Sequence, residues 1–61
     1  MKITYYIDKL EEAMKHDENV RNFCEKYMNE GSSECIDNLC VWDLDVDEED
    51  EFMASYINEY C

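Results

Sequence analysis

Residues that interrupt regular secondary structure are almost absent from this chain. Gly31 is the only glycine among the 61 residues, and there is no proline. Because few positions force the backbone into a turn, the sequence favours helices joined by short connections. We therefore predict a mainly α fold: a compact domain of three or four helices with a short extended acidic segment near residues 41–47. A chain of this length is expected to form one domain, residues 1–61, with a thin core.

Apolar side chains recur every three or four residues in the first half of the chain, as they do on one face of a helix. A first helix is predicted from the series Ile3, Tyr6, Ile7, Leu10, Ala13 and Met14. The alternation of Ile3, Tyr5 and Ile7 also fits a short strand, so residues 2–7 are open to both interpretations. A second helix is expected to begin after Asp17, which can cap it, and to stop at Gly31. Its apolar face comprises Val20, Phe23, Cys24, Tyr27 and Met28.

The second half is predicted to contain a short helix, an extended segment and a last helix. Ser33 can cap the short helix. That helix would carry Ile36, Leu39 and Cys40. The extended segment alternates Trp42, Leu44 and Val46 with Asp43, Asp45 and Asp47. The last helix is expected to follow Asp47, which stands with Asp50 in the spacing of a capping pair. Its apolar stripe, assigned to the core, comprises Phe52, Met53, Tyr56, Ile57 and Tyr60.

Four cysteines and one histidine suggest little metal chemistry. The spacing of Cys24, Cys35, Cys40 and Cys61 contains at most one pair separated as in structural zinc sites, so no metal or cofactor is predicted. Two disulfides could form in three pairings. The chain has neither a signal peptide nor an apolar membrane span, so we expect a cytoplasmic location and free thiols. His16 stands at a predicted helix end and is expected to be exposed.

Seven of the eleven residues from Trp42 to Phe52 are acidic, within a chain of net charge −12. Residues 31–61 hold ten acidic side chains and neither lysine nor arginine. The aspartates at alternate positions in this run match the first three ligands of an EF-hand loop. Glu48, however, replaces the glycine needed for the turn, and Ala54 replaces the final glutamate. A calcium site is therefore not predicted.

The acidic run can be a solvated face that keeps a small protein soluble, or it can imitate nucleic acid. So negative a chain repels nucleic acid and anionic membranes, and it attracts basic partners. In an extended segment the carboxylates of Asp43, Asp45 and Asp47 project from one face about 6.6 Å apart, and DNA phosphates follow each other at ~3.4 Å along a strand. Arginine and lysine groups that bind phosphates also bind carboxylates. The predicted partner-binding residues are Asp43, Asp45, Asp47, Glu48, Glu51, Glu59 and Tyr5.

In size and charge the chain resembles the small acidic inhibitor proteins of phages and mobile elements, including many anti-CRISPR proteins and other DNA mimics. The acidic run "DLDVDEEDE" and the lack of basic residues in residues 31–61 carry this resemblance. The resemblance implies a stoichiometric inhibitor, a monomer or small homo-oligomer in the host cytoplasm. It would occupy the basic nucleic-acid-binding surface of a CRISPR effector or another DNA-binding enzyme and block access of DNA or of the PAM.

Two other functions stay open. A regulatory adaptor, such as an antitoxin-like or polymerase-binding protein, would use aromatic surface residues. Tyr5 is a candidate because helical spacing points it away from Ile7 and Leu10. A metal-binding or redox protein would use the cysteines. An enzyme is not expected, since the chain has no nucleophile paired with a base and no phosphate-binding glycine loop.

Overall fold

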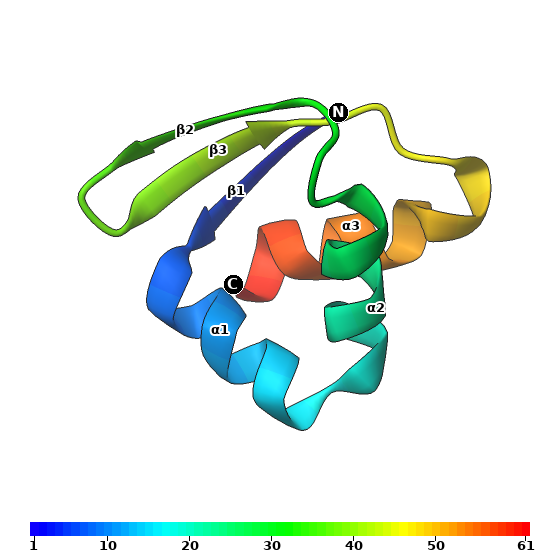
Figure 1. Cartoon of the computed structure of the whole chain (residues 1–61), viewed down its shortest axis with the longest axis horizontal. Helices are drawn as coiled ribbons and strands as arrows, with labels where there is room; N and C mark the ends of the chain where they lie inside the picture. The colour runs from blue at the N-terminus through cyan, green and yellow to red at the C-terminus, as the bar shows by residue number, and fades with distance from the viewer.

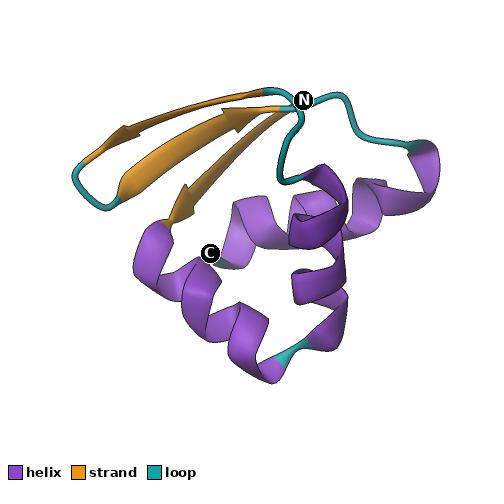
Figure 2. Ribbon diagram, in the orientation of Figure 1, coloured by secondary structure: helices purple, strands orange, loops and turns teal.

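Three helices pack against one face of a three-stranded antiparallel sheet in the computed structural model, which describes residues 1–61 (Figure 1). The elements are β1 (Lys2–Tyr6), α1 (Ile7–His16), α2 (Glu18–Tyr27), β2 (Ser32–Ile36), β3 (Leu39–Asp43), the short 3₁₀ helix η1 (Glu48–Asp50) and α3 (Glu51–Tyr60). The strand order is β1-β3-β2. The fold is thus α+β, and the prediction of a mainly α domain of three or four helices is wrong (Figure 2). None of the helices is long and apolar enough to cross a membrane.

The N-terminal segment forms a strand, as its alternating pattern allowed. Ile3 is fully buried and Tyr5 half-buried, so both lie on the face that meets the helices. The free edge of β1 is covered by α3: the Thr4 amide donates to Asn58 Oδ1 at 2.7 Å, and the Tyr6 amide donates to the Cys61 carbonyl at 2.7 Å. Pairing with β3 on one edge and with α3 on the other satisfies the backbone of β1, and the helix begins only at Ile7.

A β-hairpin replaces the short helix predicted after Ser33. β2 and β3 pair directly, and Asp37 and Asn38 form the two-residue turn, in which Asp37 has a φ of 56°. Aspartate tolerates this left-handed conformation better than most residues do. The side-chain Nδ2 of Asn38 also donates to Asp8 Oδ1 at 2.7 Å, and this hydrogen bond connects the hairpin to the start of α1. Long-range pairing therefore prevails over local helical spacing here.

Two of the four cysteines form a disulfide. Cys35 and Cys40 face each other across β2 and β3 and are bonded, so the prediction of free thiols is wrong for this pair. Cys24 and Cys61 are free and buried. Burial raises the pKa of the Cys24 thiol to about 11, which keeps it protonated and unreactive at neutral pH. Cys24 thus belongs to the core, as its place on the α2 stripe predicted.

The second helix follows its sequence signals closely. The Asp17 carboxylate accepts hydrogen bonds from the amides of Asn19 at 2.9 Å and Val20 at 3.4 Å, as an N-cap should. α2 ends at Tyr27, before Gly31, so the glycine does not stop the helix as predicted. Gly31 instead has a φ of 70° and turns the chain into β2, with its Cα close to the backbone of Asp43.

The core lies between the sheet and the helices. Trp42 is central: its ring meets Phe23 and Tyr5 edge-on, at centroid distances of 6.1 Å and 6.5 Å. Its indole Nε1 donates to the Glu30 carbonyl at 3.0 Å. The buried cluster comprises Ile3, Leu10, Val20, Phe23, Cys24, Tyr27, Trp42, Leu44, Ala54, Ile57 and Cys61. The predicted alternation after residue 41 is confirmed for Trp42 and Leu44, while Val46 is half-buried.

The last helix begins where expected, but its buried face differs from the predicted stripe. Ala54 and Ile57 are fully buried against β1 and α2. Phe52 is 82% exposed and Tyr60 63% exposed, so the assignment of these two rings to the core is wrong. α3 is apolar around more than half of its circumference, and its neighbours cover only part of that surface.

Candidate partner-binding surface

The acidic segment is anchored at its start by Leu44. This side chain is 1% exposed. Its amide donates to the Met1 carbonyl at 2.8 Å, and its carbonyl accepts from the N-terminal ammonium at 2.8 Å. Asp43 and Asp45 flank Leu44 and are exposed. The structure thus fixes the backbone from the buried side and presents these two carboxylates to solvent.

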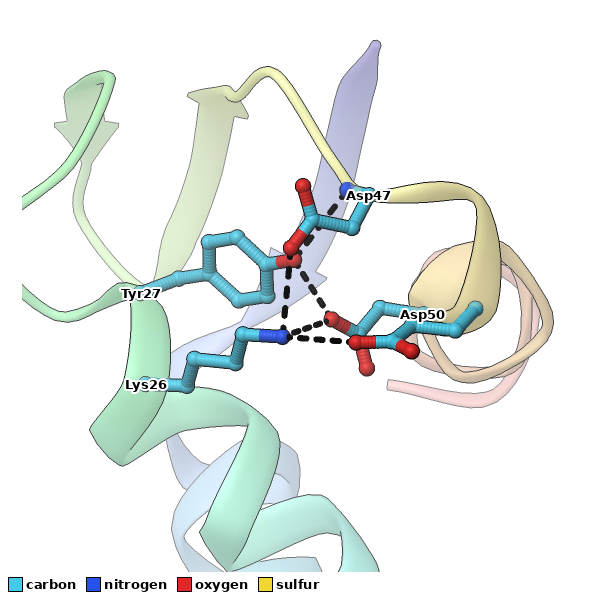
Figure 3. Close-up of polar contacts among 5 residues, drawn as sticks. Lys26, Tyr27, Asp47 and Asp50 are labelled. Atoms are coloured by element: carbon cyan, nitrogen blue, oxygen red, sulfur yellow. Dashed lines mark hydrogen bonds and ion pairs between the residues drawn. The ribbon is translucent and has the colours of Figure 1, made fainter.

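The next acids turn toward α2 and gather around a lysine (Figure 3). The Lys26 ammonium lies 2.6 Å from Asp50 Oδ2, 3.2 Å from Asp47 Oδ2 and 3.4 Å from Glu49 Oε1. The Tyr27 hydroxyl donates to Asp50 Oδ2 at 2.6 Å and accepts from the Asp47 amide at 3.1 Å. The last turn of α2 therefore holds the loop before α3 in place.

This arrangement overturns the predicted capping pair. Neither Asp47 nor Asp50 caps a helix with its side chain. Side-chain oxygens of Asp47, Glu49 and Asp50 lie within 4.8 Å of one another, a grouping that suits a cation. The ammonium of Lys26 contacts all three of these carboxylates. The cluster is thus an internal ion-pair network.

The network shifts the proton affinities of its members. Hydrogen bonds from Lys26 and Tyr27 lower the pKa of Asp50. Hydrogen bonds to Asp50 and Asp47 raise the pKa of Lys26. Burial, followed by the bond to Asp50, raises the pKa of Tyr27. Each shift favours a charged lysine, a charged carboxylate and a neutral phenol in this network.

The contribution of this network to stability is expected to depend on pH. Since the folded pKa of Asp50 is lowered, its stabilising effect is present above the unfolded value of about 3.9 and is lost as the pH falls through the folded pKa. Lys26 acts oppositely: its effect is present below the unfolded value of about 10.4 and is lost as the pH rises through the higher folded pKa. Urea midpoints of the wild type and Lys26→Met should differ at pH 7 and converge as the pH falls through the folded pKa of Asp50. A difference that persists in acid would contradict this.

The remaining predicted acids are exposed and make no ion pair. They are Asp43, Asp45, Glu48, Glu51 and Glu59. They do not follow one straight strand, because β3 ends at Asp43 and the chain leaves the sheet before η1 (Figure 1). Tyr5 does not join them: it is half-buried beside Trp42, because a strand rather than a helix directs its side chain.

Sequence reasoning missed two features of this surface. Lys26 and Tyr27 were not linked to the acidic run, although Lys26 is the last of the five basic residues before a long stretch without any. The exposed rings of α3 were also missed. Phe52, Tyr56 and Tyr60 follow each other at four-residue spacing, which separates them from Ala54 on the helix.

Comparisons with known proteins found no match for this chain among protein-family models, curated proteins or solved structures.

Proposed function

We propose that the protein is a stoichiometric inhibitor that binds the basic nucleic-acid-binding surface of a DNA-binding protein, such as a CRISPR effector subunit, and blocks its DNA or PAM site. One observation supports this above all: five exposed carboxylates between residues 43 and 59 have no cationic partner within the chain. They are Asp43, Asp45, Glu48, Glu51 and Glu59.

Free carboxylates on an anchored backbone suit a phosphate-binding surface. Arginine and lysine side chains arranged for phosphates can pair with carboxylates, often through two parallel hydrogen bonds in the case of arginine. Asp43 and Asp45 are held by the buried Leu44 between them, so little conformational entropy is lost on binding. Asp47 was predicted to make contacts too, but its carboxylate already pairs with Lys26. We therefore assign Asp47 to positioning the loop and place the main contacts on its neighbours.

The test is a competition assay with charge reversal. Purified CRISPR effector complexes and other DNA-binding proteins are each loaded with fluorescent target DNA and titrated with this protein. We expect the wild type to displace DNA at about one molecule per binding site, less effectively as salt rises. Asp45→Lys combined with Glu48→Lys should weaken displacement at least about 30-fold, since removing one member of a desolvated interfacial charge pair costs about 2 to 5 kcal/mol.

The matched control reverses the charge of two acids outside the proposed contact surface. Glu11→Lys combined with Glu25→Lys alters two exposed acids on α1 and α2 that make no ion pair. This variant should retain displacement within a few-fold of the wild type. Equal losses of DNA displacement in the two variants would show that the net charge of the protein, and not the position of its acids, determines binding. A ternary complex of effector, DNA and this protein would contradict the proposed function.

A further inference from the structure

Helix α3 exposes an aromatic strip that its own fold does not use. The strip consists of Phe52, Tyr56 and Tyr60, which are 82%, 37% and 63% exposed. The rings of Tyr56 and Tyr60 lie against each other with centroids 5.0 Å apart. On the buried side of the helix, Ala54 and Ile57 are already fully covered. The strip is therefore an apolar surface without an intramolecular partner.

Exposed aromatic rings in this number are a feature of binding surfaces. Aromatic side chains offer a large contact area, have few rotatable bonds and dominate the binding energy of many interfaces. The contact between Tyr56 and Tyr60 restrains both rings before any partner arrives, which reduces the entropy lost on binding. A strip from residue 52 to residue 60 extends about 12 Å along the helix axis, which matches about two turns of a second helix.

The charged residues around the strip indicate which charge a binding partner should carry. α3 contains no basic residue, and helical spacing places Glu59 one turn after Tyr56, at the border of the strip. At the N-terminal end, a groove of about 340 Å³ is open beside Phe52. It is lined by the apolar Phe23 and Met53, by Asn19 and Asn22, and by Lys26 in its ion pairs with Glu49 and Asp50. The unpaired charge beside the strip is that of Glu59, which suits a partner that is apolar in the middle and basic at its edges.

We propose that the aromatic strip docks a cationic amphipathic helix of the partner protein. This inference rests on the proposed function and adds that the partner presents such a helix next to its nucleic-acid-binding surface. A second copy of this chain fits poorly, because two molecules of net charge −12 repel each other. Nucleic-acid bases could stack on the rings, but the same charge repels their phosphates.

Two synthetic peptides of equal positive charge test the proposal. One is an amphipathic helix with leucine along one face and arginine along its borders; in the other, glutamine replaces every leucine. Binding of each labelled peptide to the full chain is measured by fluorescence anisotropy. The wild type should bind the leucine peptide at least about tenfold more tightly than the glutamine peptide. Phe52→Ser combined with Tyr60→Ser should abolish this difference and leave binding of the glutamine peptide unchanged.

The control variant removes apolar side chains from the other exposed patch. Tyr6→Ser combined with Ile36→Ser alters the outer face of the sheet, where the two side chains are 44% and 80% exposed. It should bind both peptides within about twofold of the wild type. Circular dichroism checks that all variants remain folded; should the double variant of α3 unfold, Phe52→Ser alone replaces it, because an 82% exposed side chain contributes little to packing.

The possible failures point to different causes. Equal affinity of the wild type for the two peptides would overturn the proposal. So would a sheet variant that loses the preference for the leucine peptide as fully as the α3 variant does. A dimer of the wild type in analytical ultracentrifugation that is lost in Phe52→Ser would also overturn it, by assigning the strip to self-association. The proposed function is tested separately with the variant Asp45→Lys combined with Glu48→Lys. This variant should bind both peptides more weakly, by the same factor. It should also fail to displace DNA, whether or not the strip binds the leucine peptide.

Discussion

Replacement of Gly31 by alanine should destabilise the protein by more than about 2 kcal/mol. Gly31 has a φ of 70°, a conformation that alanine adopts only with strain. An added Cβ would also clash with the carbonyl oxygen of Asp43 and lie 3.2 Å from the Cα of Leu44. These are backbone atoms, so relief requires β3 and the acidic segment to shift. The urea midpoint, followed by Trp42 fluorescence, measures the effect.

The neighbouring Ser32 supplies the control for this variant. Ser32 is exposed at the start of β2, and Ser32→Ala should change the free energy of unfolding by less than about 0.5 kcal/mol. A midpoint for Gly31→Ala close to that of Ser32→Ala would show that the close approach to Asp43 is not required. A domain of this size has only a few kcal/mol to lose, so a substantial unfolded population is expected in Gly31→Ala.

Leu44→Ala should have the second large effect, a loss of about 2 to 5 kcal/mol. The side chain is 1% exposed, and its truncation both forfeits burial and leaves a cavity beneath the acidic segment. Thermal unfolding by circular dichroism measures the loss. Amide hydrogen exchange adds a local readout, because the Leu44 amide donates to Met1 and should lose protection.

Val41→Ala is the comparison for this core position. Val41 lies in β3, three residues before Leu44, and is 37% exposed on the outer face of the sheet. Its truncation should cost less than about 1 kcal/mol. If Val41→Ala and Leu44→Ala unfold at the same temperature, Leu44 does not anchor the acidic segment, and the assignment of rigid carboxylates to Asp43 and Asp45 loses its basis.

Local signals in the sequence were sufficient for some elements. The cap of α2 at Asp17 and the apolar face that follows it depend on residues within two or three turns of each other. Both were predicted correctly except for Met28, which lies after the end of α2 and is exposed. The alternation around Leu44 likewise predicted which side of the acidic segment is buried. The prediction that Asp43 and Asp45 face outward required nothing beyond this pattern.

Other features depend on segments far apart in the sequence. Residues 2–6 were open to a helix or a strand, and a short helix was predicted after Ser33. Residues 2–6 and 32–36 are both strands because each pairs with residues 39–43. The same pairing places Cys35 opposite Cys40 and makes their disulfide possible. Periodicity within a short segment carries no information about its pairing partner, so the sheet and the disulfide were missed.

By itself, the sequence determined the charge of this protein, the position of α2 and the outward direction of the first acids. Tertiary structure alone decided which acids remain free and which aromatic rings remain exposed. Lys26 contacts three carboxylates because the end of α2 packs beside the loop before α3. Helix α3 has apolar side chains on two sides, and β1 and α2 cover only one of them. Phe52 and Tyr60 lie on the other side and remain exposed to solvent. Both outcomes depend on the spatial neighbours of each side chain, which local spacing does not specify.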